Sequence, residues 1–114
     1  MYRIALIIGE VYTKYLPFAE KHKISLNLDI TNQAILTDQP DELKQHLDQH
    51  LDSALRRSSG GEITITLSGT SLDITDNGTI LSKSACRLLS HGRIQVTSRI
   101  GFGTTVSIDL TKNS

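Results

Sequence analysis

The sequence predicts an α+β domain in which about three helices cover one face of a mixed, mostly antiparallel sheet. Stretches with strand-like alternation follow stretches with helical periodicity along the chain. Most neighbouring strand patterns are separated by short turns, which is typical of hairpins. Together these observations favour a two-layer α/β sandwich. With 114 residues and no linker, repeat or low-complexity tract, a single domain is expected over residues 1–114.

Residues 4–22 are expected to form the first helix. Apolar residues recur at helical spacing in this segment, including Val11 and Phe18. Pro17 interrupts the pattern, so a kink or a break is expected there. The apolar stripe of residues 4–11 suits packing either on the domain's own sheet or on an upstream helix, and the pattern alone leaves both alternatives open.

Two strands and a second helix are expected next. Residues 25–30 alternate between apolar and polar side chains, as in a strand with one buried face, and residues 34–36 form a short strand. The helix is expected over residues 40–57, with Asp38 or Gln39 as its N-cap. A Ser-Ser-Gly-Gly run is expected to end it with a glycine in the left-handed cap. Its buried stripe comprises Leu43, Leu47, Leu51 and Ala54.

The second half of the chain is expected to add two hairpins and a short helix. Residues 62–67 and 71–75 alternate and flank a Ser-Gly-Thr turn. Ser82 is expected to cap a helix that ends at a His-Gly pair. Residues 94–98 and 106–110 form the last hairpin around a Gly-Phe-Gly turn. The apolar residues of the short helix are Ala85, Cys86, Leu88 and Leu89.

The composition argues against several classes of function. Twelve basic and twelve acidic residues give zero formal charge, so the whole domain is not expected to bind nucleic acid or anionic membranes. Two Phe, three Tyr and no Trp offer little surface for stacking bases. The longest apolar run is too short to insert into a bilayer. The single cysteine, Cys86, suits a reducing, cytosolic compartment and is expected to be a buried structural thiol.

Three segments, in order, resemble the ATP-binding catalytic domain of sensor histidine kinases, which belongs to the Bergerat-fold (GHKL) superfamily. The first, residues 37–55 followed by residues 60–63, resembles the helix that carries the family's N box and its exit. The second, the Asp-Asn-Gly of residues 76–78, resembles the first glycine box. The third, residues 90–94 and 101–106, resembles the closing helix and hairpin.

The resemblance covers the chain from about Leu16 to Leu110 and implies a Bergerat-type sandwich. It implies ATP and Mg²⁺ as ligands, and a response-regulator receiver domain or a partner histidine kinase with its dimerisation hairpin as partners. The chain is expected to be the C-terminal part of a longer cytoplasmic signalling protein, including the cytosolic portion of a membrane-bound sensor. The family's phosphorylated histidine lies on a separate upstream hairpin, and none precedes Met1, so the chain alone is not expected to autophosphorylate.

The nucleotide site departs from the family's pattern. Ser53 stands where the family's asparagine holds magnesium, and a hydroxyl is a poorer ligand than an amide carbonyl. Gln49 replaces an earlier asparagine, Arg57 replaces an aromatic residue, and Ile80 replaces the second glycine of the first glycine box. The second glycine box and the flexible lid, which close over the triphosphate in the family, are missing.

Six residues would form the nucleotide site if it were retained. Asp76 matches the adenine-reading aspartate, although Asp-Asn-Gly is also an ordinary turn composition. Ser53 is the candidate magnesium ligand, and no residue is assigned a catalytic role. Arg56 and Arg57 resemble a phosphate clamp or, alternatively, favour the helix dipole. The six nucleotide-site candidates are Asp76, Gly78, Ser53, Gln49, Arg56 and Thr104.

Three interpretations remain. In the first, the domain binds no nucleotide tightly and acts in a phosphorelay as a docking or regulatory module, pseudokinase or histidine-phosphotransferase-like. In the second, it is a minimal active catalytic domain that binds ATP and Mg²⁺ and phosphorylates a histidine on a separate domain. In the third, it is an anti-sigma-type kinase or a fragment whose lid was removed by engineering. His46 and His50 have zinc-like spacing without a supporting carboxylate pattern, and His91 is expected to be structural.

Overall fold

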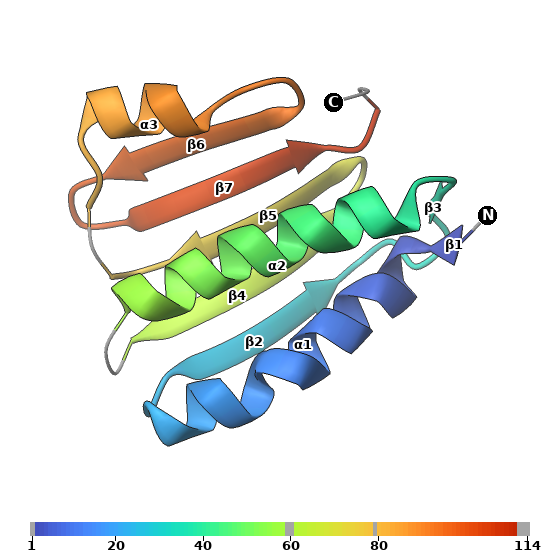
Figure 1. Cartoon of the computed structure of the whole chain (residues 1–114), viewed down its shortest axis with the longest axis horizontal. Helices are drawn as coiled ribbons and strands as arrows, with labels where there is room; N and C mark the ends of the chain where they lie inside the picture. The colour runs from blue at the N-terminus through green and yellow to red at the C-terminus, as the bar shows by residue number, and fades with distance from the viewer. Residues whose placement is uncertain (1, 59–60, 79, 112–114) are drawn as a thin grey trace.

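The computed structural model describes residues 2–58, 61–78 and 80–111. Five strands form one mixed sheet in the order β2-β4-β5-β7-β6, in which β2 and β4 pair in parallel and the other neighbours pair antiparallel. The three helices lie on one face of this sheet, so the predicted α+β two-layer sandwich is confirmed (Figure 1). In chain order the elements are β1 (Tyr2–Arg3), α1 (Ile4–Lys21), β2 (Ser25–Ile30), β3 (Leu36–Thr37), α2 (Pro40–Arg57), β4 (Glu62–Ser68), β5 (Ser71–Asp76), α3 (Lys83–Leu89), β6 (Ile94–Arg99) and β7 (Gly103–Asp109).

The two faces of the sheet differ in chemistry. The face under the helices carries buried aliphatic side chains, of which Ile65 and Ile74 are cross-strand partners. The opposite face carries short hydroxyl side chains, and the Thr75 and Thr105 hydroxyls lie 3.2 Å apart across β5 and β7. A polar face of this kind can remain in water, because an antiparallel sheet needs only one packed face.

Helix α1 packs on the domain's own core. Ile4, Ile8 and Val11 are essentially inaccessible to solvent, which decides between the two alternatives for the apolar stripe. The helix is continuous through Pro17, so the predicted break is absent. An internal proline costs a helix about 3 kcal/mol, and burial of residues on both sides, including Ala19, offsets this cost. No helix within the described residues is both long enough and apolar enough to cross a membrane.

A small second sheet forms where the chain enters α1. Strand β1 pairs antiparallel with β3, and the Ile4 amide donates to the Ile35 carbonyl at 3.1 Å. The short strand was expected at residues 34–36 and lies at Leu36–Thr37, while β1 was not predicted. Strands of two residues are too short to show alternation, so their position depends on pairing that sequence periodicity does not report.

Helix α2 has the predicted bounds, Pro40–Arg57, and its predicted stripe is fully buried against the sheet. Gln39 is the N-cap by position, but its side chain makes no capping hydrogen bond. At the other end Ser58 caps the helix in an extended conformation. The left-handed glycine expected there is not Gly61, whose φ is not positive, and the other candidate, residue 60, lies outside the described residues.

The apolar residues of helix α3 are more exposed than the sequence predicts. Its N-cap is as predicted, because the Ser82 hydroxyl accepts a hydrogen bond from the Ala85 amide at 3.1 Å. None of its seven residues, all of them described, is buried, and Leu88 is 83% exposed. Cys86 is partly exposed, so the prediction of a buried thiol is wrong. The short helix contacts β6 at the edge of the sheet, where no further layer covers its outer side.

Candidate nucleotide site

Asp76 lies at the end of β5, in the middle of the sheet. It pairs with Ile63 on β4 and with Thr104 on β7, and only 1% of its surface is exposed. Its Oδ2 accepts a hydrogen bond from Arg57 Nη2 at 3.0 Å, and its Oδ1 accepts one from the Gly78 amide at 3.0 Å. Both carboxylate oxygens are therefore bound by donors of the chain itself.

The end of α2 closes on the turn that follows Asp76. A Cβ atom at Gly78 would lie 2.9 Å from the Ser58 hydroxyl oxygen, so a larger residue there would require the Ser58 side chain to move. Asn77 holds the same turn against β4, because its Oδ1 accepts a hydrogen bond from the Glu62 amide at 2.8 Å. The turn is thus clamped between the last residues of α2 and the first residue of β4.

Thr104 lies opposite Asp76 and is fully buried. Its hydroxyl is 2.9 Å from the Ser98 hydroxyl, which also accepts a hydrogen bond from the Leu81 amide at 2.9 Å. The structure therefore brings Thr104 and Gly78 to Asp76, as the resemblance implies. In this arrangement the Ser98 hydroxyl joins the last hairpin to the segment that leads into α3, and the Thr104 hydroxyl contacts Ser98 within the hairpin.

Among the described residues, no hydrogen bond or ion pair joins the three candidates on α2 to Asp76. Gln49 is exposed and Ser53 is partly exposed. Arg56 is exposed, and its Nε donates to Asp52 Oδ2 at 2.9 Å in an i,i+4 pair on the helix surface. No group of three or more His, Cys, Asp or Glu side chains among the described residues is arranged to hold a metal ion.

Arg57 is a site residue that the six nucleotide-site candidates left out, although the resemblance gave it with Arg56 as a phosphate clamp. It follows the buried Ala54 by three residues and the buried His50 by seven, which places it on the inner face of α2. Helical periodicity alone would have distinguished it from Arg56, which lies about 100° away around the helix. The resemblance directed attention to Arg56 because Arg56 occupies the family's basic position.

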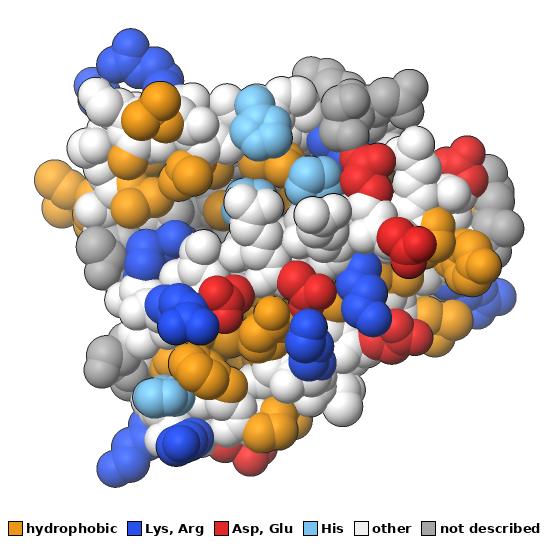
Figure 2. All heavy atoms as spheres, viewed as in Figure 1, with side chains coloured by type: hydrophobic (Ala, Val, Ile, Leu, Met, Phe, Trp, Pro, Cys, Tyr) orange, Lys and Arg blue, Asp and Glu red, His pale blue; other side chains and the backbone are white. Residues whose placement is uncertain are grey.

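A group of histidines lies between α2 and the start of β6. Histidine side chains gather at the centre of the face shown in Figure 2. The His46 and His50 rings stack with centroids 6.5 Å apart, and Glu42 Oε1 lies 3.6 Å from His46 Nε2 and 3.5 Å from Arg93 Nη2. His50 is buried, and its Nε2 has no hydrogen-bond partner among the described residues. Burial, followed by the nearby charges of His46, His91 and Arg57, lowers the pKa of His50 to about 4.

Acid is expected to destabilise the domain through His50. Its folded pKa of about 4 lies below the unfolded value of 6.5, so the unfolded chain binds more protons between these values. The stability due to neutral His50 is complete above pH 6.5 and is lost as the pH falls from 6.5 to about 4. We expect urea unfolding to show a loss of about 2 kcal/mol between about pH 7 and about pH 5.

The matched control for this pH effect is His22, which is exposed at the end of α1. His50→Leu is expected to flatten the stability profile over that range, and His22→Asn is expected to leave it unchanged. Equal profiles for wild type and His50→Leu would contradict the assignment.

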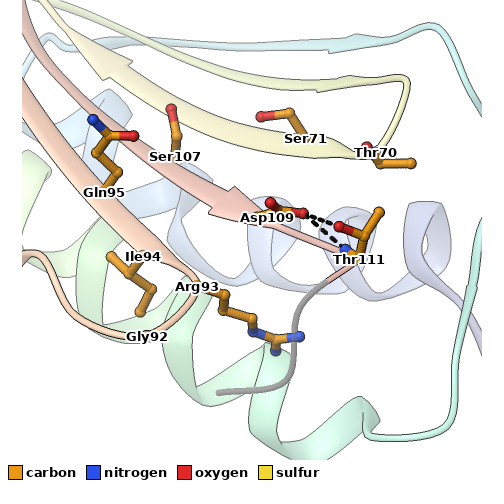
Figure 3. A pocket seen from close by; sticks show the side chains of 9 residues that line it. All are labelled: Thr70, Ser71, Gly92, Arg93, Ile94, Gln95, Ser107, Asp109 and Thr111. Atoms are coloured by element: carbon orange, nitrogen blue, oxygen red, sulfur yellow. Dashed lines mark hydrogen bonds between the residues drawn. The ribbon is translucent and has the colours of Figure 1, made fainter.

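A hollow lies at the opposite end of β5 from Asp76. It has a volume of about 430 Å³ and a polar lining that includes Ser71, Ser107 and Asp109 (Figure 3). Asp109 accepts hydrogen bonds from the Thr111 amide and hydroxyl at 2.9 and 2.6 Å, and the Arg93 side chain points away from Ser107 and Gln95. Because Asp76 and Ser71 are at opposite ends of β5, this hollow is separate from the candidate nucleotide site.

Comparison with solved structures identifies the fold. No protein-family model matches the chain, and no curated protein matches it significantly. The cytoplasmic segment of histidine kinase QseC is similar with a TM-score of 0.78 and 22% identity, over 94% of this chain and 70% of that one. The nucleotide-free catalytic domain of histidine kinase ThkA is similar with a TM-score of 0.75 and 17% identity, over 95% and 92%. Histidine kinase ThkA in complex with the response regulator TrrA is similar with a TM-score of 0.75 and 16% identity, over 99% and 41%. The chain has the fold of the ATP-binding catalytic domains of histidine kinases.

Proposed function

We propose that the chain is a two-component or phosphorelay signalling domain that no longer uses its nucleotide site and acts as a docking or regulatory module. Its partner is a response-regulator receiver domain or a partner histidine kinase. The observation that carries the proposal is the state of Asp76, whose carboxylate is buried and bound by Arg57 and Gly78. In the family this carboxylate is the group that reads adenine.

The energies favour the internal pair over an incoming base. A hydrogen bond from adenine to a carboxylate contributes about 1.5–3 kcal/mol. Separating Arg57 from Asp76 would leave a buried charge without its partner, which costs about 3–5 kcal/mol. Millimolar affinity already requires about 4 kcal/mol of net binding energy. With Ser53 and Gln49 replacing asparagines on α2, magnesium offers little compensation, so tight ATP binding is not expected.

The partner class is supported by the structural comparison. ThkA, whose fold this chain shares, has been solved in complex with a response regulator. We further propose that the chain is the C-terminal part of a longer cytoplasmic protein, with a histidine-bearing hairpin supplied by another segment or another chain. Such a module would position a receiver domain without transferring phosphate itself.

The test is calorimetric titration of the chain with purified receiver domains and histidine-bearing hairpin domains from its source organism. We expect at least one receiver to bind, and ATP to leave that binding unchanged. In parallel, the chain is incubated with labelled ATP and with each histidine-bearing hairpin domain of that organism. Absence of binding to every receiver and every hairpin domain would contradict the docking role. ATP-dependent labelling of a hairpin histidine would instead support the minimal active kinase.

A further inference from the structure

The charge of the chain is unevenly distributed. Residues 77–108 contain no Asp or Glu, whereas they contain Lys83, Arg87, Arg93 and Arg99. Since the chain as a whole has zero formal charge, the balancing acidic residues lie in other parts of the sequence. This basic stretch includes all of α3 and β6.

A groove lies between α3 and the edge strand β6. Its volume is about 580 Å³, which is within the usual range for a binding pocket, and apolar surface predominates in its lining. Cationic side chains and apolar side chains both contribute to it. The lining includes Leu81, Cys86, Val96, Lys83, Arg87 and Arg99.

Exposed apolar side chains extend this surface beyond the groove. Ile100 is 89% exposed and Phe102 is 70% exposed in the turn after β6, and Leu88 projects from α3. The Arg99 guanidinium lies 5.1 Å from the centre of the Phe102 ring. In Figure 2, exposed apolar side chains with Lys and Arg at their margins occupy the upper left, where Figure 1 places α3 and β6. Grouped apolar surface of this kind is typical of an interaction site.

The backbone edge of β6 is already partly occupied. The Ile94 amide and carbonyl are both bonded to His91, and the Val96 amide donates to the Ser90 hydroxyl at 2.8 Å. The first half of β6 therefore does not present the row of free backbone groups that an added strand requires. A partner at this surface would be held by its side chains.

We infer that the α3–β6 groove docks an acidic segment of a partner protein, which inserts leucine-sized apolar side chains into the groove and places carboxylates against Lys83, Arg87 and Arg99. The inference rests on the proposed docking role and names its surface. Charge complementarity selects an acidic partner, and the apolar lining selects a protein segment over nucleic acid. The small number of aromatic residues also disfavours stacked bases.

The test uses the full chain labelled with ¹⁵N and a synthetic peptide that alternates pairs of glutamate with single leucines. We expect amide shift changes to concentrate in residues 81–89 and 96–99. Lys83→Glu combined with Arg87→Glu is expected to weaken binding about tenfold, the equivalent of about 1.4 kcal/mol. Both side chains are exposed, so the fold should tolerate the change. Arg3→Glu with Lys21→Glu, an equal charge change outside the groove, is the matched control and should bind like wild type.

Three results with the peptide would overturn the inference. The first is that millimolar peptide causes no amide shift changes, and the second is that the changes are centred outside the groove. The third is that a peptide in which serine replaces every leucine binds equally well. Equal binding of a single-stranded oligonucleotide would also overturn it, because charge alone would then explain the contact. If the peptide binds at the groove but no receiver domain binds the chain, the groove remains a docking site for an acidic segment, and the receiver is excluded as its partner. The two proposals can therefore fail separately.

Discussion

Replacement of Arg57 by methionine is expected to destabilise the domain by about 3–5 kcal/mol. The substitution keeps an apolar side chain of similar length but leaves the Asp76 carboxylate buried without its cationic partner. The Gly78 amide would remain as a donor to Oδ1, and one neutral donor does not replace a guanidinium. Urea unfolding followed by circular dichroism at neutral pH measures the change.

Arg56→Met is the matched control, because Arg56 is the adjacent residue and its ion pair with Asp52 is exposed. Exposed pairs of this kind contribute about 0.2–1 kcal/mol, so the control should remain close to wild type. Adding Asp76→Asn to Arg57→Met is expected to recover part of the lost stability, since the uncompensated charge is then removed. Equal losses of stability for the two arginine variants would show that the buried Arg57–Asp76 pair contributes no more stability than the exposed Arg56–Asp52 pair.

Gly103→Ala is expected to cost about 3–5 kcal/mol, from two separate causes. Gly103 has φ of +90°, where a side chain is strained, and a Cβ there would meet the Asp76 carbonyl oxygen at 1.8 Å. Since that oxygen belongs to the backbone, the strand and the turn would have to separate. The variant is expected to unfold at a much lower urea concentration than wild type.

Gly101→Ala separates the two causes. Gly101 belongs to the same hairpin and has φ of +87°, but nothing lies within 4 Å of a Cβ placed there. It should therefore show only the backbone strain, about 1–2 kcal/mol. If Gly101→Ala and Gly103→Ala lose equal stability, the close approach of β7 to the Asp76 turn contributes nothing.

Periodicity predicted the regular elements well where they are long. The bounds of β2 and α2 are confirmed, because their apolar residues repeat at the period of each element. Only α2 buries its whole predicted face, since Leu28 on the edge strand β2 is 37% exposed. The same reasoning was insufficient at α3. Its apolar residues predict one buried side, but periodicity does not report whether another layer exists to cover Leu88.

The candidate site could be predicted only in part. The resemblance placed Asp76, Gly78 and Thr104, which the structure brings together at the ends of β5 and β7. It did not predict the bond between Arg57 and Asp76, which joins residues 19 positions apart on different elements. Contacts of this kind depend on the angle at which α2 crosses the sheet, and that angle is set by packing of the whole core.

ATP titration by calorimetry, with and without magnesium, tests most directly whether the chain has given up its nucleotide site. The internal Asp76–Arg57 pair predicts no measurable heat up to millimolar ATP, in either condition, for the folded wild-type chain. Micromolar, magnesium-dependent binding would contradict that account and would favour a working kinase domain.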